Sequence, residues 1–182
     1  AEARGISVFQ ILDAQAAAVA PGSEGVRIRD DWQGNRSPYK NPGARGAITG
    51  LSLAHGSGHL VRALYEATAC GTRHILEDAA KHGLRVDRLF LGGGGAKSEL
   101  WMRIHASVLG MPIHLPAESE ACALGSAMVA AVRSEVFPDL DSAAQAMVRI
   151  DRVVEPDPTE KAEYDEVFAD YVQLYHRLNS EH

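Results

Sequence analysis

Four consecutive glycines occupy positions 92–95, between a short apolar run and an amphipathic segment. Glycine loses more conformational freedom on folding than any other residue and buries no side chain, so four in a row are costly. The preceding run, residues 89–91, has the apolar character and the length of a buried strand. We therefore infer a turn at which something approaches the backbone too closely for a side chain to fit.

The segment after the glycines predicts a helix that begins near Ser98 and ends at Gly110. Serine is favoured at helix N-caps, and glycine is favoured just after a helix ends. Apolar residues recur between them at helical spacing: Leu100, Trp101, Ile104, Val108 and Leu109. Residues 111–115 then predict a second strand. A strand, glycine turn, helix and strand in this order indicate a parallel strand pair, whose turn offers backbone N–H groups that suit phosphates or polar heterocycle atoms.

The glycine turn matches neither of the two common nucleotide motifs. In a Walker A loop, Ala96 would stand where the last glycine belongs and Leu91 where the first belongs. The dinucleotide fingerprint, started at either of the first two glycines, meets Lys97 or Ser98 instead of its last glycine. Tight packing of the chain against itself therefore stays open as an alternative to nucleotide binding.

The composition narrows the class of protein and its partners. With 182 residues, the chain is long enough for one domain with a sizeable core. Its formal net charge of −6 argues against nucleic acid or an anionic membrane as the main partner. No apolar stretch approaches the length of a membrane span, and residues 1–5 do not resemble a signal peptide, so we expect a cytoplasmic protein.

The cysteines and histidines do not indicate a disulfide or a metal site. Cys70 and Cys122 lie far apart on predicted helices, so we expect reduced thiols. His55 and His59 are spaced i, i+4, but no acidic or third ligand follows at a useful distance. We therefore expect no metal held by this pair.

The rest of the chain predicts an α/β order. Helices are expected over 6–20, 58–83, 117–132, 142–148 and 159–178, the last with Thr159 as its cap, and strands near 26–28 and 47–53. A long loop rich in turn residues fills 32–46, and 150–158 is expected to be a connector. Small residues on one face of the helix over 58–83 predict close packing against another element: Ala63, Ala67 and Gly71.

Four stretches, in this order, resemble the carboxy-terminal domain of the FGGY family of carbohydrate kinases: residues 32–46, 50–67, 92–113 and 119–131. The resemblance covers about residues 5–178. Leu64 is one departure from the second signature of the family, which runs through Gly46, Gly50, His59, Ala63, Tyr65 and Glu66. The stretch 33–38 is closer to the pentulokinase branch, which includes kinases similar to D-ribulokinase, than to glycerol kinase.

The resemblance implies a ribonuclease-H-like, or actin-like ATPase, domain, which is an α/β fold with a central sheet flanked by helices. By the family match the first strands of this sheet precede Ala1, so we expect a sheet truncated at those strands. Residues 1–182 would then form the nucleotide-side domain, with the amino-terminal sugar-binding domain absent.

In the family, ATP lies between the two domains, and the glycine turn of the second domain lies against the adenosine. Carried over by position, Gly93, Gly94 and Gly95 form the cofactor-binding turn, with Gly94 and Gly95 along the adenine and ribose. Ser98 would offer a side-chain hydrogen bond. A flat base can lie against a backbone only where no Cβ stands in its way. Lys97 is expected to be a solvated side chain, or at most to attract a phosphate weakly.

The resemblance places the catalytic aspartate and most sugar contacts in the amino-terminal domain, so no catalytic residue is expected here. Asp30 and Asp31 could be mistaken for the base, but the match places them at a strand end before residues 32–38. The implied function is the nucleotide-binding half of a kinase that transfers the γ-phosphoryl group of ATP, with Mg²⁺, to a hydroxyl of a ketopentose-like sugar. We expect the isolated chain to be inactive.

The alternative function is a non-catalytic binding or oligomerisation module derived from such a kinase. A Rossmann-type dehydrogenase or methyltransferase is disfavoured, because Pro116 and Ala117 separate the second predicted strand from the nearest acid. An unpaired sheet edge tends to find another chain, and the cleft face that the other domain would cover adds apolar surface, so we expect a homodimer or concentration-dependent self-association through one of these surfaces. The alternative is a monomer in which the helix over 6–20 covers that edge.

Overall fold

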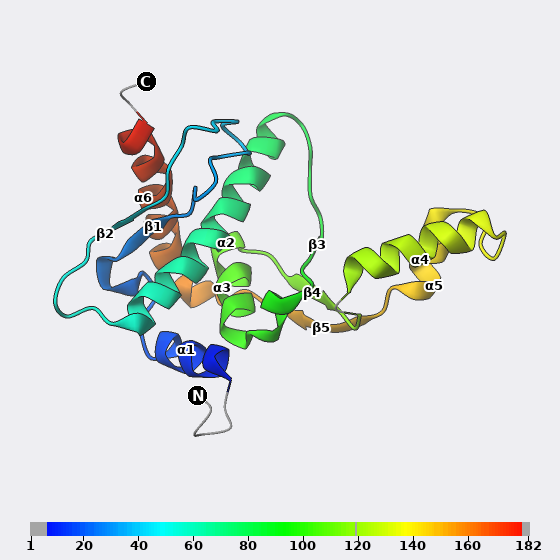
Figure 1. Cartoon of the computed structure of the whole chain (residues 1–182), viewed down its shortest axis with the longest axis horizontal. Helices are drawn as coiled ribbons and strands as arrows, with labels where there is room; N and C mark the ends of the chain where they lie inside the picture. Colours follow the sequence, from blue (N-terminus) through cyan, green and yellow to red (C-terminus); the bar gives the residue numbers. More distant parts are fainter. Residues whose placement is uncertain (1–6, 119, 180–182) are drawn as a thin grey trace.

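The computed structural model describes residues 7–118 and 120–179, which form a mixed α/β fold (Figure 1). Its α-helices are α1 (Val8–Ala17), α2 (Ser57–Lys81), α3 (Glu99–Leu109), α4 (Ala121–Arg133), α5 (Leu140–Met147) and α6 (Lys161–Asn179). Its strands are β1 (Arg27–Arg29), β2 (Ala47–Thr49), β3 (Leu89–Phe90), β4 (Ile113–Pro116) and β5 (Ile150–Val154). Short 3₁₀ turns are η2 (Ser23–Gly25), η3 (Gly94–Lys97) and η4 (Pro158–Glu160). Within the described residues, the predicted helices and strands are confirmed to within a few residues, and positions 6 and 119 of the predicted helices lie outside the described residues.

The larger sheet joins three strands in the order β3–β4–β5, and β1 and β2 form a separate antiparallel pair. β3 runs parallel to β4, with Leu89 opposite Ile113, which confirms the predicted crossover through α3. β5 pairs antiparallel with β4 and places Val154 opposite Ile113. The connector predicted over 150–158 is therefore wrong for β5. Five residues without clear alternation carry little strand signal of their own, and pairing with β4 stabilises the extended conformation.

Helix α2 is the centre of the main core and contacts α1, α3, α6 and β1. Its buried face includes Ala63, Ala67 and Cys70, which pack with side chains of those neighbours such as Ile28, Ile104 and Tyr171. Gly71 lies so close to α6 that a Cβ there would stand 3.1 Å from Tyr171 Oη. The close packing predicted for the small residues of this helix is confirmed.

Helix α3 has two buried faces. One packs on α2 in the main core, and the other covers the sheet in a smaller cluster of Met102, Ala106, Ile113, Leu115 and Val154. Because α3 follows the glycines directly, these two contacts fix the position of the glycine turn.

The ends of two helices test the capping predictions. α3 ends at Gly110, which adopts the left-handed conformation with φ 64°, as predicted. At the start of the terminal helical segment, the carboxylate of Asp157 accepts the N–H of Thr159 at 2.9 Å, and Pro158 follows Asp157 in the first turn. Asp157 is therefore the cap, and the prediction of Thr159 is wrong.

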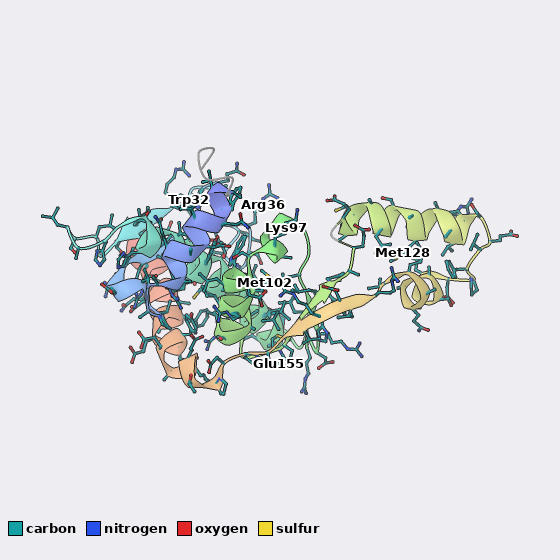
Figure 2. The ribbon with its side chains drawn as sticks, turned by 90° about the horizontal axis from the view of Figure 1, so that it is seen from below. Trp32, Arg36, Lys97, Met102, Met128 and Glu155 are labelled. Atoms are coloured by element: carbon teal, nitrogen blue, oxygen red, sulfur yellow. The ribbon has the colours of Figure 1, made fainter. Side chains whose placement is uncertain are left out.

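Helices α4 and α5 project from the other elements, as Figures 1 and 2 both show. No residue of α4 is buried, although most of its side chains are apolar. It carries Cys122 as an exposed free thiol, whereas Cys70 is a buried free thiol on α2. Within residues 7–118 and 120–179, no helix combines the length and apolar character needed to cross a membrane.

Candidate functional site

The glycine turn leads from the end of β3 through η3 into α3. Its backbone closes on itself, because the N–H of Ala96 donates to Gly93 O at 3.2 Å and that of Ser98 donates to Gly95 O at 3.0 Å. Ser98 is the N-cap of α3, and its Oγ accepts the N–H of Trp101 at 3.1 Å. The cap predicted from the sequence is confirmed.

The glycines of the turn are glycines for different physical reasons. Gly93 has φ 81° and ψ −167°, a conformation that is essentially restricted to glycine. At Gly95, a Cβ would stand 2.4 Å from Cζ3 of Trp101, so the indole excludes any side chain. Gly94 has neither constraint: it is exposed, and no described atom lies within 4 Å of the position of its Cβ.

Trp101 is fixed against Gly95 by two neighbours on α2. Its indole stacks on the ring of Tyr65 with centroids 4.9 Å apart and an interplanar angle of 13°. Its Nε1–H donates to Thr68 Oγ1 at 2.8 Å. Tyr65 in turn donates its hydroxyl to Asp13 Oδ1 at 2.6 Å, which ties α1 to the same assembly. The glycine turn is thus held by side chains from three helices.

Burial in this assembly changes the pKa of the Tyr65 phenol. It raises that pKa to about 12, and the hydrogen bond to Asp13 adds to the rise. A hydrogen bond from Ser98 partly opposes it. At neutral pH the phenol is therefore an un-ionised donor, as the contact with Asp13 requires.

The four residues predicted to bind nucleotide, Gly93, Gly94, Gly95 and Ser98, lie together in this one turn. Gly94 faces open space, and Gly95 is covered on one side by Trp101. Ser98 is only 9% exposed and turns its hydroxyl toward α3 and Tyr65, so the structure gives it a capping role. Lys97 is exposed (Figure 2). Contact of any of these residues with a nucleotide stays a prediction.

Sequence reasoning missed Trp101, Thr68 and Asp13 as supports of the turn. The helical spacing marked Trp101 as an apolar position but could not show which side of α3 its large ring would cover. Tyr65 was recognised through the family signature, and the structure now gives it a physical role as the stacking partner of Trp101.

Another signature residue, Glu66, holds the η2 turn. Its Oε1 accepts the N–H of Gly22 at 2.9 Å and its Oε2 accepts the hydroxyl of Ser23 at 2.9 Å. Arg62 pairs with the same carboxylate at 3.0 Å and also donates to Tyr164 Oη at 2.8 Å. Burial raises the pKa of Glu66, and Arg62 opposes the rise. Glu66 is thus part of a buried structural network in which its polar atoms are paired.

Asp30 and Asp31 are both engaged in contacts within the fold. Asp31 pairs with Arg29 at 2.7 Å and accepts Nδ2 of Asn35 at 2.8 Å. Asp30 accepts the hydroxyl of Tyr171 at 2.8 Å, and burial raises the pKa of its carboxyl. Neither acid belongs to the glycine turn. Within the described part of the chain, no three His, Cys, Asp or Glu side chains gather as a metal site would require.

Comparisons with known proteins show what this chain is similar to. A family model described as the C-terminal domain of the FGGY family of carbohydrate kinases matches residues 3–134. The ribulokinase of Bacillus licheniformis is 34% identical over 181 residues, which cover 96% of this chain and 33% of that protein. An FGGY carbohydrate kinase domain-containing protein of Danio rerio is 37% identical over 153 residues, covering 82% of this chain and 28% of that protein.

The fold is shared with solved structures. The crystal structure of xylulose kinase from Rhodospirillum rubrum matches with a TM-score of 0.82 and 37% identity, over 94% of this chain and 34% of that chain. This match confirms the predicted actin-like fold class. The chain spans about a third of the length of the curated relatives that it matches.

Proposed function

This chain belongs to the FGGY family of carbohydrate kinases, and we propose that it forms the nucleotide-binding half of an ATP-dependent sugar kinase. The whole enzyme would transfer the γ-phosphoryl group of ATP to a hydroxyl of a ketopentose-like sugar. The names of the relatives, ribulokinase and xylulose kinase, support this class of acceptor. Residues 1–182 would contribute one wall of the cleft that holds ATP.

The observation that carries the proposal is the open face of Gly94. The backbone conformation accounts for Gly93, and Trp101 accounts for Gly95, but no described contact requires a glycine at position 94. A flat purine and its ribose would fit a backbone without a Cβ at this point. The rigid support of the turn by Trp101 and Tyr65 would keep that surface in place before a ligand arrives.

The chemistry of phosphoryl transfer assigns the remaining tasks. Catalysis of this reaction depends on positioning the phosphates and on neutralising the charge that develops on them, and Mg²⁺ would supply part of that neutralising charge. The turn of this chain would hold and orient the nucleoside, while its N–H groups and the start of α3 provide a positive end of a helix nearby. In this proposal, the other wall of the cleft binds the sugar and supplies the base that accepts the proton of the sugar hydroxyl.

Ligand-dependent thermal stability tests the proposal. A ligand that binds the folded chain and not the unfolded chain raises the melting temperature. We expect ATP or ADP to raise it and NAD to leave it unchanged at the same concentration. An equal effect of NAD, or no effect of ATP at millimolar concentration, would contradict a kinase-type nucleotide site.

A second candidate function is a non-catalytic binding or oligomerisation module, and α4 is the observation that favours it. This helix is mostly apolar, yet none of its residues is buried. Apolar helices of this kind are normally covered by another surface. Self-association without any nucleotide-dependent stabilisation would favour this candidate over the kinase half.

A further inference from the structure

A cavity of about 580 Å³ lies beside the loop that follows β1, on the flank of α2. Its walls include Asp30, Trp32 and Arg36 from the loop and Thr68 and Thr72 from α2. We call it the loop cavity. None of the residues of the glycine turn lines it, and its volume lies in the range of small-molecule sites.

Trp32 forms an aromatic platform at this cavity. A Cβ on Gly46 would stand 2.2 Å from Cε3 of the indole, so the ring lies directly on the backbone of Gly46. Even so, 54% of the Trp32 surface is exposed (Figure 2). An indole that is backed by the chain and open to solvent presents a negative ring face, which attracts the slightly positive C–H groups on the apolar face of a sugar.

The floor of the cavity carries a carboxyl group that is held in place. Asp30 Oδ1 accepts the hydroxyl of Tyr171 at 2.8 Å, whereas Oδ2 approaches the surface of α2 at Gly71, 3.8 Å from the position of a Cβ there. The pair with Tyr171 leaves acceptor capacity on Oδ2. Carboxylate oxygens of this kind accept hydrogen bonds from sugar hydroxyls.

An exposed arginine, Arg36, lines the cavity from a loop whose backbone is held by hydrogen bonds. Arg36 is exposed, and its guanidinium has no hydrogen-bond or ion-pair partner among residues 7–118 and 120–179. The preceding residue fixes the backbone, since Asn35 N–H donates to Asn41 O at 2.8 Å and its Oδ1 accepts the N–H of Tyr39 at 3.0 Å. A guanidinium on a loop whose backbone is held in this way can bind a phosphate group through two parallel hydrogen bonds.

We propose that the loop cavity binds a sugar phosphate, with the sugar face on Trp32, its hydroxyls on Asp30 and its phosphate on Arg36. The three groups favour a ligand with a hydroxylated end and an anionic end. Inorganic phosphate would leave the indole unused and approach the Asp30 carboxyl, and a neutral sugar would leave Arg36 unused. The proposal does not depend on nucleotide binding at Gly94.

An NMR titration of the ¹⁵N-labelled chain with ribulose 5-phosphate tests the site. The two tryptophans give separate indole signals, and we expect the ligand to shift that of Trp32 together with the amides of residues 33–37. The Trp101 indole donates to Thr68 in the wall of the same cavity, so a smaller shift of its signal is expected as well. Ribulose and inorganic phosphate, titrated separately, are each expected to bind at least about tenfold more weakly, since each loses one set of contacts.

Variants identify the groups responsible. Arg36→Gln is expected to weaken ribulose 5-phosphate binding by about tenfold, the cost of a charge-assisted hydrogen bond. Arg88→Gln, an equal change of charge at another exposed arginine, is the matched control and should leave the affinity unchanged. Trp32→Phe should retain part of the affinity, and Trp32→Ala should lose it. Because Arg36 is exposed and has no hydrogen-bond or ion-pair partner among the described residues, its variant keeps the test valid if changes at Trp32 disturb the loop.

Three outcomes overturn the proposal. Equal affinities of the Arg36→Gln and Arg88→Gln variants would exclude the guanidinium. Inorganic phosphate that binds as tightly as ribulose 5-phosphate, with the same shifts, would reduce the site to a plain anion site. Shifts confined to residues 93–98 would place the ligand at the glycine turn and not in the loop cavity.

Discussion

The indole of Trp101 lies against the backbone of Gly95 so closely that a Cβ on Gly95 would stand 2.4 Å from Cζ3. The chain itself therefore explains one of its consecutive glycines. Conformation explains a second, because Gly93 has a φ of 81°. At Gly94 the described structure leaves the backbone uncovered. This difference between neighbouring glycines separates the structural part of the turn from the part available to a ligand.

The contact with Trp101 predicts unequal effects of the same substitution at adjacent positions. Gly95→Ala should destabilise the chain by about 2 kcal/mol, because the added methyl group overpacks the site against the indole. Gly94→Ala is the matched control and should change the free energy of unfolding by less than about 0.5 kcal/mol. Urea denaturation of the two variants measures both values. Equal stabilities would mean that Trp101 does not cover Gly95 in solution.

This contact also changes how Gly95 can be used to test nucleotide binding. A branched residue such as Val at position 95 would displace Trp101 even without a ligand, so a loss of binding would not identify the site. Gly94 accepts a side chain without a clash with described atoms, so a side chain there would compete with the proposed ligand without displacing Trp101.

The phenol of Tyr65 predicts a loss of stability at high pH. Its pKa is raised from 10.0 to about 12 in the folded chain, so folding favours the un-ionised form. The corresponding stabilisation is fully present below the unfolded pKa and is lost as the pH rises through the folded pKa, between about pH 10 and 12.

The free energy of unfolding of Tyr65→Phe should fall less between about pH 10 and 12 than that of the unmodified chain, because the substituted ring cannot ionise. Denaturation series at several pH values from 8 to 12 compare the two proteins, and their difference removes the contribution of the other tyrosines. A parallel fall of both curves would show that Tyr65 is not buried against Asp13 as described.

Self-association is expected through the apolar surface of α4. Sedimentation over a hundredfold range of concentration should show a rising average mass. Val129→Asp, at a residue of α4 that is 52% exposed, should shift association to higher concentration. Val136→Asp, at a residue that is 66% exposed and lies beyond α4, is the control. A constant monomer mass throughout would reject self-association.

A polypeptide of residues 1–182 is expected to show no sugar kinase activity. The two acids that follow β1 are engaged with Arg29, Asn35 and Tyr171. One wall of a cleft would neither hold the sugar hydroxyl close to ATP nor supply a base for its proton. A coupled assay for ADP release with ribulose and xylulose measures this. Sugar-dependent turnover that rises in proportion to the concentration of pure polypeptide would refute the expectation.

The glycine turn and its helix could be predicted because their signals are local. Ser98 and Gly110 bracket an amphipathic segment, and both act as the sequence indicates. β5 could not be predicted, since its conformation depends on pairing with β4, which lies far away in the sequence. The cap of the terminal helical segment was predicted at Thr159, whereas Asp157 caps it. Pro158 directly after Asp157 is the sequence signal that favours Asp157.

The sequence predicted the position of the glycine turn but not the side chains that support it. The motifs located the turn at residues 93–98, whereas its support depends on side chains from other helices. Trp101 covers Gly95 because Tyr65 and Thr68 fix the indole, and neither contact follows from helical spacing alone. The buried network of Glu66 was also hidden, since its partner Gly22 lies 44 residues away along the chain.

The most direct test of the account is an NMR titration of the ¹⁵N-labelled chain with ATP, carried out on the unmodified protein and on two valine variants. Gly94→Val places a branched side chain on the open face of the turn, and Gly125→Val, at a second glycine with no described atom within 4 Å of its Cβ position, is the control. We predict shifts centred on residues 93–95, an affinity at least about tenfold weaker for Gly94→Val, and no change for Gly125→Val. Shifts centred elsewhere, or unaltered affinity in Gly94→Val, would contradict the claim that this turn binds the nucleotide.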